Sequence, residues 1–238
     1  MFKKIVSFTL LSAAFAGIST SAIADEASVK KAVEAAYPKF KVESVAKTPY
    51  AGLYEVFMGG QIIYTDEKMS FLIAEGHLVD PKTKKDITGE RMEELTKIDF
   101  STLPLDQAIK VVKGNGSRKL VVFSDVDCPY CKRLEKDLAN VTDVTIYTFL
   151  YPIPSLHPDA ARKSKAIWCA PNRQKAWDDY MLRGVLAADK SCDSPIDEIQ
   201  AVGQKYKMNG TPTLVFADGR VVPGAISTSD METYLNGK

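Results

Sequence analysis

Cys128 and Cys131 are the residues of this chain whose type and spacing are best suited to chemistry. They lie in the stretch FSDVDCPYCKRLEKDL, directly after an apolar run. Two cysteines separated by two residues can bind a metal, form a small structural disulfide, or exchange disulfides with other proteins. These three interpretations place different demands on the rest of the chain.

The metal interpretation requires further ligands. A structural zinc site has four ligands, commonly arranged as two close pairs. Cys169 and Cys192 are far apart in the sequence, and His77 and His157 do not form a pair with ligand spacing. We therefore expect no metal at this position and no cofactor other than a redox-active disulfide.

The redox interpretation has a physical basis, whereas a purely structural disulfide across so short a loop removes little entropy from the unfolded chain. Cys128 is predicted to lie where a strand gives way to a helix, so unpaired N–H groups and the positive end of the helix dipole favour its thiolate. Pro129 suits the first helical turn, since it donates no N–H. Cys128 would attack a substrate disulfide, and Cys131, one turn into the helix, would expel the substrate.

Two strands and a helix are predicted to position this pair. KLVVF (119–123) is a continuous apolar run typical of a strand buried on both faces, and VTIYTFLYP (144–152) is a second strand. A right-handed crossover makes these strands parallel, with the helix packed on the sheet through Leu134, Leu138 and Val141. The pattern is a βαβ unit.

The rest of the C-terminal half reads as helices followed by a hairpin. Helical segments occupy most of 160–206, with Trp168 and Trp177 expected in the core. GTPTLVFADGRVVPG (210–224) predicts two strands joined at Asp218-Gly219, and a final helix follows from about residue 229 to residue 235.

The N-terminal half predicts a small antiparallel sheet with one helix, between about residues 25 and 86. The helix spans 26–37, and the strand-like pieces are GLYEVFM, QIIYT, SFLIAEG and HLVD. A sheet this small leaves much of its surface and its edges exposed, and dimerisation would cover both. TGERMEELTKI (88–98) reads as a connecting helix; the alternative is that it is the first helix of the second domain.

The first 24 residues have the pattern of a secretory signal peptide, with Lys3 and Lys4 before an apolar stretch and small residues at Ala22 and Ala24. Export to an oxidising compartment follows. Of the 31 basic and 30 acidic residues, two lysines lie in this segment, which leaves 29 basic and 30 acidic residues and makes nucleic acid a poor partner.

The stretches CPYC, KAIWCA, SCD and GTPTLVFADGRVVPG together resemble the bacterial periplasmic disulfide isomerases of the DsbC/DsbG family. CxxC alone is moderately specific, but its combination with a downstream Gly-Thr-Pro, a second cysteine pair and this N-terminal extension is strong. The resemblance implies an α+β N-terminal dimerisation domain, a linker helix, and a C-terminal α/β thioredoxin-like domain with a helical insertion. The boundaries would be a signal peptide over 1–24, then 25–86, 87–104 and 105–238.

The resemblance also implies roles for individual residues. Pro212 would be the cis-proline that faces the active-site cysteines, and Pro129, Tyr130 and Thr211 would border the substrate with it. Cys169 and Cys192 would form a structural disulfide, which the chain-entropy model values at about 3–4 kcal/mol.

Two nearby polar residues receive no catalytic role from the sequence. In thioredoxins a buried acid lies six residues before the first cysteine, and Val122 occupies that position here. Asp125 is therefore expected to serve in a turn or cap, and His157 is expected in a surface loop.

The function predicted is that of a periplasmic protein disulfide isomerase with associated chaperone activity. Its partners would be misfolded disulfide-containing periplasmic proteins, an inner-membrane thiol reductase of the DsbD type, and a second copy of the chain. The alternatives are a DsbG-like or DsbA-like thiol oxidase or sulfenic-acid reductase, and a non-catalytic chaperone dimer. The dipeptide Pro129-Tyr130 does not decide between these.

Overall fold

The computed structural model describes residues 21–237, and the chain divides after Gly76 into two compact units. Each unit has its own apolar core. Most of the predicted signal peptide lies outside the described residues, and its last four residues form the start of the first helix.

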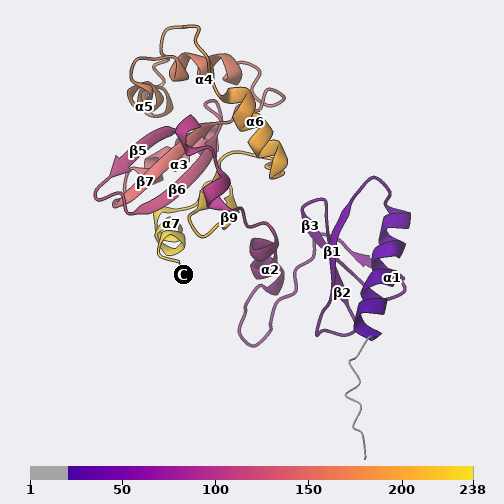
Figure 1. Ribbon diagram of the computed structural model, residues 1–238. Helices are drawn as coiled ribbons and strands as arrows, with labels where there is room; N and C mark the ends of the chain where they lie inside the picture. Colours follow the sequence, from indigo (N-terminus) through magenta and orange to yellow (C-terminus); the bar gives the residue numbers. More distant parts are fainter. Residues whose placement is uncertain (1–20, 238) are drawn as a thin grey trace, which may run out of the picture. The chain divides into compact units, whose positions relative to one another are not determined.

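The N-terminal unit is a four-stranded antiparallel sheet with a helix on one face (Figure 1). The strand order follows the sequence, β1-β2-β3-β4. Val29 and Val33 of the helix are fully buried against Val42, Tyr54 and Val56 of the strands. The bounds are α1 Ser21–Ala36, β1 Val42–Lys47, β2 Tyr54–Met58, β3 Gln61–Thr65 and β4 Leu72–Ile73.

The predicted helix and antiparallel sheet are confirmed in this unit, but the strands differ in detail. The sequence analysis misses β1, VESVAK, because charged and small residues break its apolar pattern and only Val42 is buried. SFLIAEG forms a strand only over Leu72–Ile73. HLVD forms no strand and contributes a single bridge between Val79 and Asp86.

The C-terminal unit begins with the helix α2 Ile87–Leu95 and two short 3-10 turns, η1 Phe100–Thr102 and η2 Leu105–Gln107. Asp86 caps α2 by accepting a hydrogen bond from the Gly89 N–H at 2.9 Å. After the helix, the buried Ile98 donates its N–H to the Gly219 carbonyl at 2.9 Å. The connecting segment therefore packs as part of the second unit.

A five-stranded mixed sheet, in the order β5-β7-β6-β8-β9, is the centre of this unit. β6 and β7 are parallel and the other neighbours are antiparallel, so the predicted βαβ unit is confirmed. The crossover helix is α3 Pro129–Leu138. The strands are β5 Ile109–Lys113, β6 Arg118–Ser124, β7 Val144–Leu150, β8 Thr213–Phe216 and β9 Val221–Pro223.

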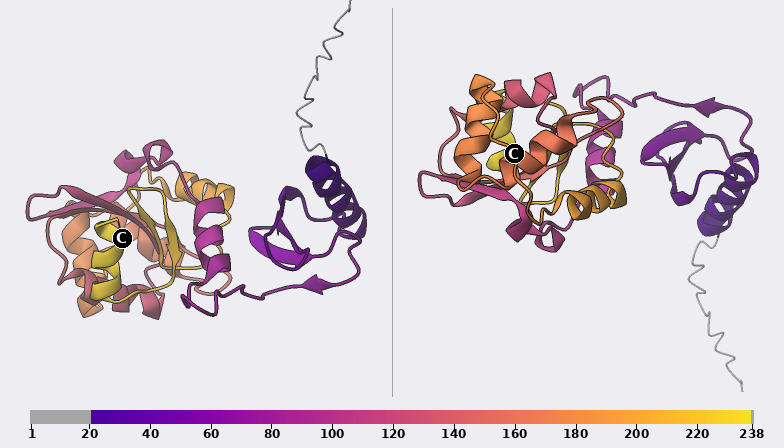
Figure 2. Two further views of the ribbon diagram at one scale, coloured as in Figure 1. Left: turned by 90° about the horizontal axis from the view of Figure 1, so that it is seen from below. Right: turned by 90° about the horizontal axis from the view of Figure 1, so that it is seen from above.

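Helices cover both faces of this sheet (Figure 2). On one face, Leu134 and Leu138 of α3 pack with Met231 of α7 over the apolar side chains of β6, β7 and β8. On the other face, Ile199 of α6 packs with Ile98. The remaining helices are α4 Ala160–Trp168, α5 Arg173–Arg183, α6 Ile196–Lys205 and α7 Thr228–Leu235.

The predicted helical insertion is confirmed as α4, α5 and α6, which lie between β7 and β8 in the chain. Trp168 and Trp177 are buried, as expected, in a cluster that also contains Cys128 and Cys131. The helical insertion therefore packs against the cysteine pair within one apolar cluster. The predicted hairpin is also present, with Gly219 in the left-handed region at φ 88°.

Candidate active site

Cys128 is the residue that joins the buried strand β6 to the helix α3. It is the N-cap of α3, with extended backbone, and Pro129 occupies the first helical turn. Its N–H donates to the Asp125 carbonyl at 3.2 Å, and this bond closes the turn between strand and helix. The Cys128 side chain is 5% exposed. The sulfur therefore stands at the helix N-terminus, where unpaired N–H groups favour an anion.

Cys131 lies one helical turn further on and is fully buried. Both sulfurs are free thiols. Burial raises the pKa of Cys131 to about 12, and the neighbouring Cys128 adds to this rise, while hydrogen bonds from Ser124, Asp125 and Thr211 oppose it. The two cysteines of one motif thus have unlike positions: Cys128 is the N-cap of the helix, and Cys131 is fully buried one turn inside it.

The loop before β8 brings the substrate-facing residues of the predicted site to Cys128. The Cys128 thiol donates to the carbonyl oxygen of Thr211 at 3.2 Å, across 83 positions of the chain. The Thr211-Pro212 peptide bond is cis. The Pro212 carbonyl accepts a hydrogen bond from the Gly224 N–H at 2.7 Å, which ties this loop to the end of β9.

Pro129 and Tyr130 are exposed beside the cysteines. The Tyr130 side chain is 59% exposed, and the Arg133 guanidinium lies 5.7 Å from the centre of its ring. Arg133 is held in turn by a 2.9 Å hydrogen bond to the Ala225 carbonyl. An exposed aromatic ring next to Cys128 is suited to contact with an extended peptide.

Asp125 has the turn role that the sequence predicts, and it is more deeply buried than a turn residue needs to be. Its fully buried carboxylate accepts hydrogen bonds from the Asp127 N–H at 2.8 Å and the Ile153 N–H at 2.7 Å. The imidazole of His157 lies 3.0 Å from the same carboxylate. His157 lies in a loop, as expected, but its side chain is only 23% exposed and contacts the buried Asp125.

Cys169 and Cys192 are joined by a disulfide, with their Cα atoms 5.7 Å apart. The bond links the C-terminal end of α4 to the segment before α6. Trp168 supports the same connection, because its indole N–H donates to the Asp193 carbonyl at 3.1 Å. Cys169 also packs against the apolar cluster that contains Cys128 and Cys131.

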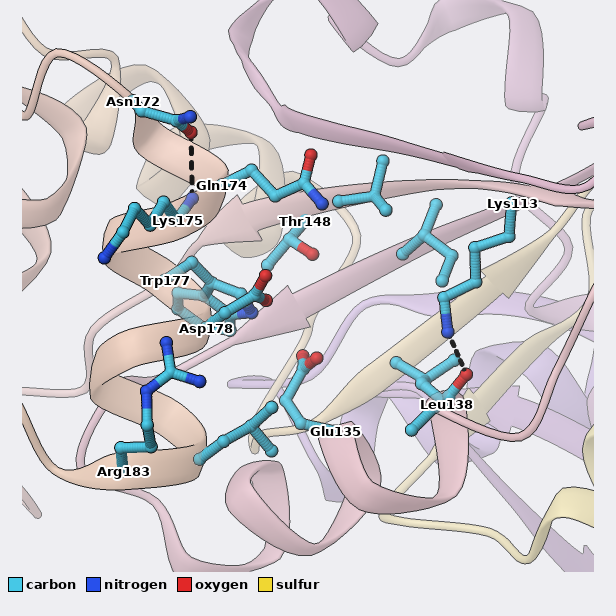
Figure 3. A pocket seen from close by; sticks show the side chains of 14 residues that line it. Lys113, Glu135, Leu138, Thr148, Asn172, Gln174, Lys175, Trp177, Asp178 and Arg183 are labelled. Atoms are coloured by element: carbon cyan, nitrogen blue, oxygen red, sulfur yellow. Dashed lines mark hydrogen bonds between the residues drawn. The ribbon is translucent and has the colours of Figure 1, made fainter.

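A pocket of about 500 Å³ lies between α3, α5 and the strands β5 and β7 (Figure 3). Neither active-site cysteine lines it. Burial raises the pKa of Glu135 there to about 7, an effect that the Trp177 indole and Lys113 oppose. Burial also lowers the pKa of Lys113.

Within residues 21–237, no three histidine, cysteine or acidic side chains lie close enough together to hold a metal ion. No helix in this part of the chain has the length and apolar character needed to cross a membrane.

Sequence reasoning missed one charged residue of the site, Asp127, which directly precedes Cys128. Its carboxylate contacts Lys163 and Tyr180, which are 36 and 53 positions away. Contacts of that range leave no periodic pattern in a sequence. The only local signal is an acidic residue adjacent to the first cysteine.

Comparison with protein families identifies both units. Residues 105–237 match the thioredoxin-like domain, and residues 20–89 match the disulfide bond isomerase protein N-terminal domain. The crystal structure of a disulfide interchange protein from Neisseria gonorrhoeae is 48% identical, with a TM-score of 0.55; the match covers 57% of this chain and 97% of that one.

Two curated proteins extend the match over most of the chain. The probable thiol:disulfide interchange protein DsbC of Bordetella pertussis is 43% identical over 87% of this chain and 73% of its own length. The thiol:disulfide interchange protein DsbC of Escherichia coli is 30% identical over 99% and 96%, respectively. Together with the free cysteine pair beside the Thr211-Pro212 loop, these matches establish that the chain belongs to the DsbC family of thiol:disulfide interchange proteins.

Proposed function

We propose that this protein is a protein disulfide isomerase in which Cys128 attacks substrate disulfides and Cys131 resolves the resulting intermediate. The observation that carries the proposal is the contrast between the two thiols. Cys128 caps a helix N-terminus and contacts Thr211, whereas Cys131 is fully buried with a pKa raised to about 12.

The first step is attack by the Cys128 thiolate on one sulfur of a substrate disulfide. A bond forms between that sulfur and Cys128, the substrate disulfide breaks, and the other substrate sulfur leaves as a thiolate that takes a proton from water. The substrate backbone would lie along Thr211 and Pro212, with Pro129 and Tyr130 on its other side. This geometry is a form of strand-like peptide recognition.

The intermediate then has two fates. A different thiolate of the substrate can attack its mixed-disulfide sulfur, which forms a new substrate disulfide and releases the Cys128 thiolate without net oxidation or reduction. Alternatively, Cys131 attacks the Cys128 sulfur, which gives a Cys128–Cys131 disulfide and a substrate reduced by two electrons. A thiol reductase of the DsbD type would return the protein to its dithiol form.

The buried state of Cys131 favours the first fate. A thiol attacks as its thiolate, and a pKa of about 12 leaves Cys131 protonated throughout the neutral range. Resolution is therefore slow, and the substrate has time to rearrange.

Recovery of activity by a scrambled multi-disulfide protein tests the proposal. The reduced wild-type protein should restore activity, and the double variant Cys128→Ser/Cys131→Ser should not. Equal recovery with both proteins would overturn the isomerase function. The same double variant tests the proposed chaperone activity, since it should still suppress aggregation of an unfolded client.

The N-terminal residues 25–86 would act as a dimerisation domain, 87–104 as a connecting segment and 105–238 as the catalytic domain. The match of residues 20–89 to the isomerase N-terminal domain supports a homodimer. Two sites in one assembly would raise the local concentration of thiols around a misfolded chain. Sedimentation of the full-length protein should give the dimer mass, and a monomer would contradict this part of the proposal.

The cellular setting proposed is the periplasm, reached through the N-terminal signal peptide. Misfolded disulfide-containing proteins of that compartment would be the substrates. Recovery of the protein from a periplasmic extract, with Cys128 and Cys131 mostly reduced, is the expected result. A mostly oxidised pair would indicate an oxidase instead.

A further inference from the structure

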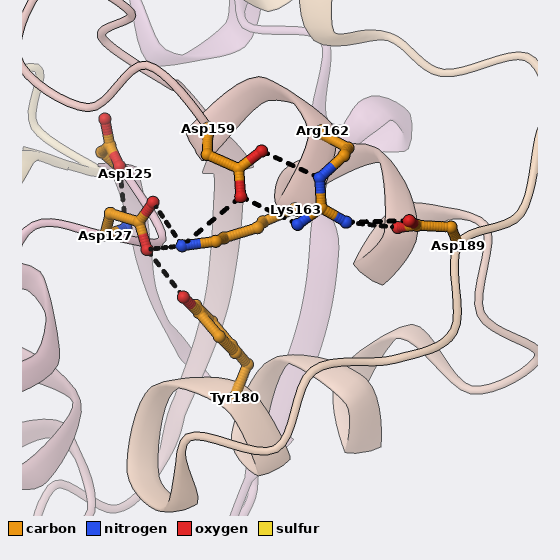
Figure 4. Close-up of polar contacts among 7 residues, drawn as sticks. All are labelled: Asp125, Asp127, Asp159, Arg162, Lys163, Tyr180 and Asp189. Atoms are coloured by element: carbon orange, nitrogen blue, oxygen red, sulfur yellow. Dashed lines mark hydrogen bonds and ion pairs between the residues drawn. The ribbon is translucent and has the colours of Figure 1, made fainter.

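The carboxylate of Asp127, the residue immediately before Cys128, is held by two side chains of the helical insertion (Figure 4). Lys163 of α4 donates to both of its oxygens, at 2.8 Å and 2.9 Å. The Tyr180 hydroxyl of α5 donates to one of them at 2.6 Å. Two of the three insertion helices, α4 and α5, therefore meet at the residue that precedes the attacking cysteine.

The ion pair between Asp127 and Lys163 is partly buried, unlike an ordinary ion pair on a protein surface. The Asp127 side chain is 17% exposed and that of Lys163 is 22% exposed. Burial acts to raise the pKa of Asp127, but the hydrogen bonds from Lys163 and Tyr180 outweigh it and leave the pKa lowered. Asp127 is therefore ionised at neutral pH, with a cation bound to it.

Three other groups surround this pair close to Cys128. The Lys132 ammonium, on α3, lies 5.0 Å from the centre of the Tyr180 ring. Asp125 accepts the Asp127 N–H at 2.8 Å and also contacts His157.

The neighbouring cation on α4, Arg162, pairs with carboxylates other than Asp127. Arg162 pairs with Asp159 and with Asp189, all at more exposed positions. Lys163 itself lies 3.8 Å from Asp159, so a single carboxylate links the inner and outer pairs. Figure 4 shows that, of the two neighbouring cations on α4, Lys163 is directed to Asp127 and Arg162 to Asp159 and Asp189.

A charge at position 127 acts on a thiolate at position 128. Consecutive Cα atoms are about 3.8 Å apart, and charges at neighbouring positions act on one another when they are closer than a Debye length, roughly 8–10 Å. An uncompensated carboxylate there would disfavour the Cys128 thiolate, whereas an uncompensated ammonium would favour it. The ion pair cancels most of both effects.

We propose that Asp127, Lys163 and Tyr180 are positioning residues that fix the active-site turn, residues 125–128, to the helical insertion and balance the charge beside Cys128. This inference rests on the proposed role of Cys128 as the attacking thiolate. Because Lys163 lies on α4, the helical insertion would contribute to the charge around the active-site turn together with the thioredoxin-like sheet and α3.

Two single substitutions with opposite charge effects test the proposal. Lys163→Met keeps the apolar stem and leaves the Asp127 charge unpaired, so alkylation of reduced Cys128 by iodoacetamide at neutral pH should slow, on the order of fivefold. Asp127→Asn leaves Lys163 unpaired, and the same rate should rise by a similar factor. Mass spectrometry of the alkylated peptide assigns the product to Cys128.

The double variant Asp127→Asn/Lys163→Met should return the rate close to that of wild type. Tyr180→Phe keeps both charges and should slow alkylation slightly, because one hydrogen bond to the carboxylate is lost. Lys165→Met is the matched control, since it removes an exposed cation from α4 two positions beyond Lys163 and outside the Asp127, Asp159 and Arg162 contacts. Its rate should equal that of wild type.

Each outcome bears on the proposal. It is overturned if Lys163→Met and Asp127→Asn change the alkylation rate in the same direction, because loosened packing would then explain both changes. It is also overturned if neither substitution changes the rate, because the ion pair would then have no effect on Cys128. It is also overturned if Lys165→Met matches Lys163→Met, since the effect would then be general surface charge. Urea midpoints of all variants report whether the fold is retained.

The alkylation rate requires no substrate protein and no isomerase activity. If the rates shift as expected while recovery of a scrambled protein is the same with wild type and with the double cysteine variant, the isomerase function fails and the positioning role stands. If recovery depends on Cys128 but the rates do not move, the positioning role fails alone.

Discussion

The two cysteine pairs of this protein have opposite exposure and opposite bonding. Cys128 and Cys131 are buried and free, whereas Cys169 is half-buried, Cys192 is exposed, and the two are bonded. Exposure alone would have selected the second pair as the reagent. What distinguishes the reactive pair is its position at a helix N-terminus beside the Thr211-Pro212 loop. The bonded pair instead connects the end of α4 to the segment before α6, across 23 positions.

Among substitutions that distinguish the two cysteine pairs, Cys128→Ser is expected to have the largest effect on activity. Disulfide isomerisation should fall to the uncatalysed rate, because serine does not form the thiolate that attacks a disulfide. Cys131→Ser should instead keep some isomerisation and accumulate mixed disulfides that are visible on non-reducing gels. Retained activity in Cys128→Ser would mean that the pairs are misassigned.

Removal of the bonded pair should affect stability rather than chemistry. Cys169→Ala/Cys192→Ala is expected to lower the free energy of unfolding by about 3 kcal/mol, since the unfolded chain regains the entropy of an open loop. Urea denaturation measures this loss. The alkylation rate of Cys128 should be the same as in wild type, and a large change there would show that the two pairs are coupled.

Alkaline pH should destabilise the reduced protein through Cys131. Its pKa is about 12 in the folded chain, against about 8.5 for an unfolded cysteine, so the folded state binds more protons between these values. The free energy of unfolding should therefore fall as pH rises, by at most about 1.4 kcal/mol per pH unit. The slope should be smaller in Cys131→Ala, and equal slopes would contradict a buried, protonated Cys131.

The smallest effect on stability is expected from Arg173, which contacts Trp168 next to the Cys169–Cys192 disulfide. The Arg173 guanidinium lies 3.6 Å from the centre of the Trp168 ring, and its Nε donates to the Trp168 carbonyl at 2.8 Å. Arg173→Ala should cost about 0.5–1 kcal/mol, the range for an exposed cation on an aromatic ring. Arg183→Ala, at the other end of α5, is the control. A loss as large as that from removing the disulfide would show that the helices depend on Arg173.

The sequence predicts well those elements in which local pattern and burial agree. KLVVF and VTIYTFLYP lie in β6 and β7, whose apolar residues are buried on both faces, and the parallel pairing follows from the crossover helix. The edge strand β5, IKVVK, is not predicted from the sequence. One of its faces is exposed, and Lys110 and Lys113 interrupt its apolar residues. Its pairing with β7 stabilises it in a way that its own residues do not reveal.

The candidate site likewise contains residues that short motifs predict and contacts that no local pattern predicts. Cys128, Cys131, Pro129 and the Gly-Thr-Pro segment can be read from short motifs, and the structure brings Thr211 to Cys128. The contact of His157 with Asp125 and that of Lys163 with Asp127 span 32 and 36 positions, so they depend on how the insertion folds back on the active-site turn. Sequence spacing carries no information about such contacts.

The order of the four cysteines along the chain has a consequence for how the protein acquires its own disulfide. The bonded pair consists of the third and fourth cysteines, and the free pair of the first and second. Oxidation that simply joins each cysteine to the next one synthesised therefore gives the native connectivity, with no crossed bonds to undo. A protein proposed to repair the disulfides of others has a topology that does not require repair, so its biogenesis need not depend on an earlier copy of itself.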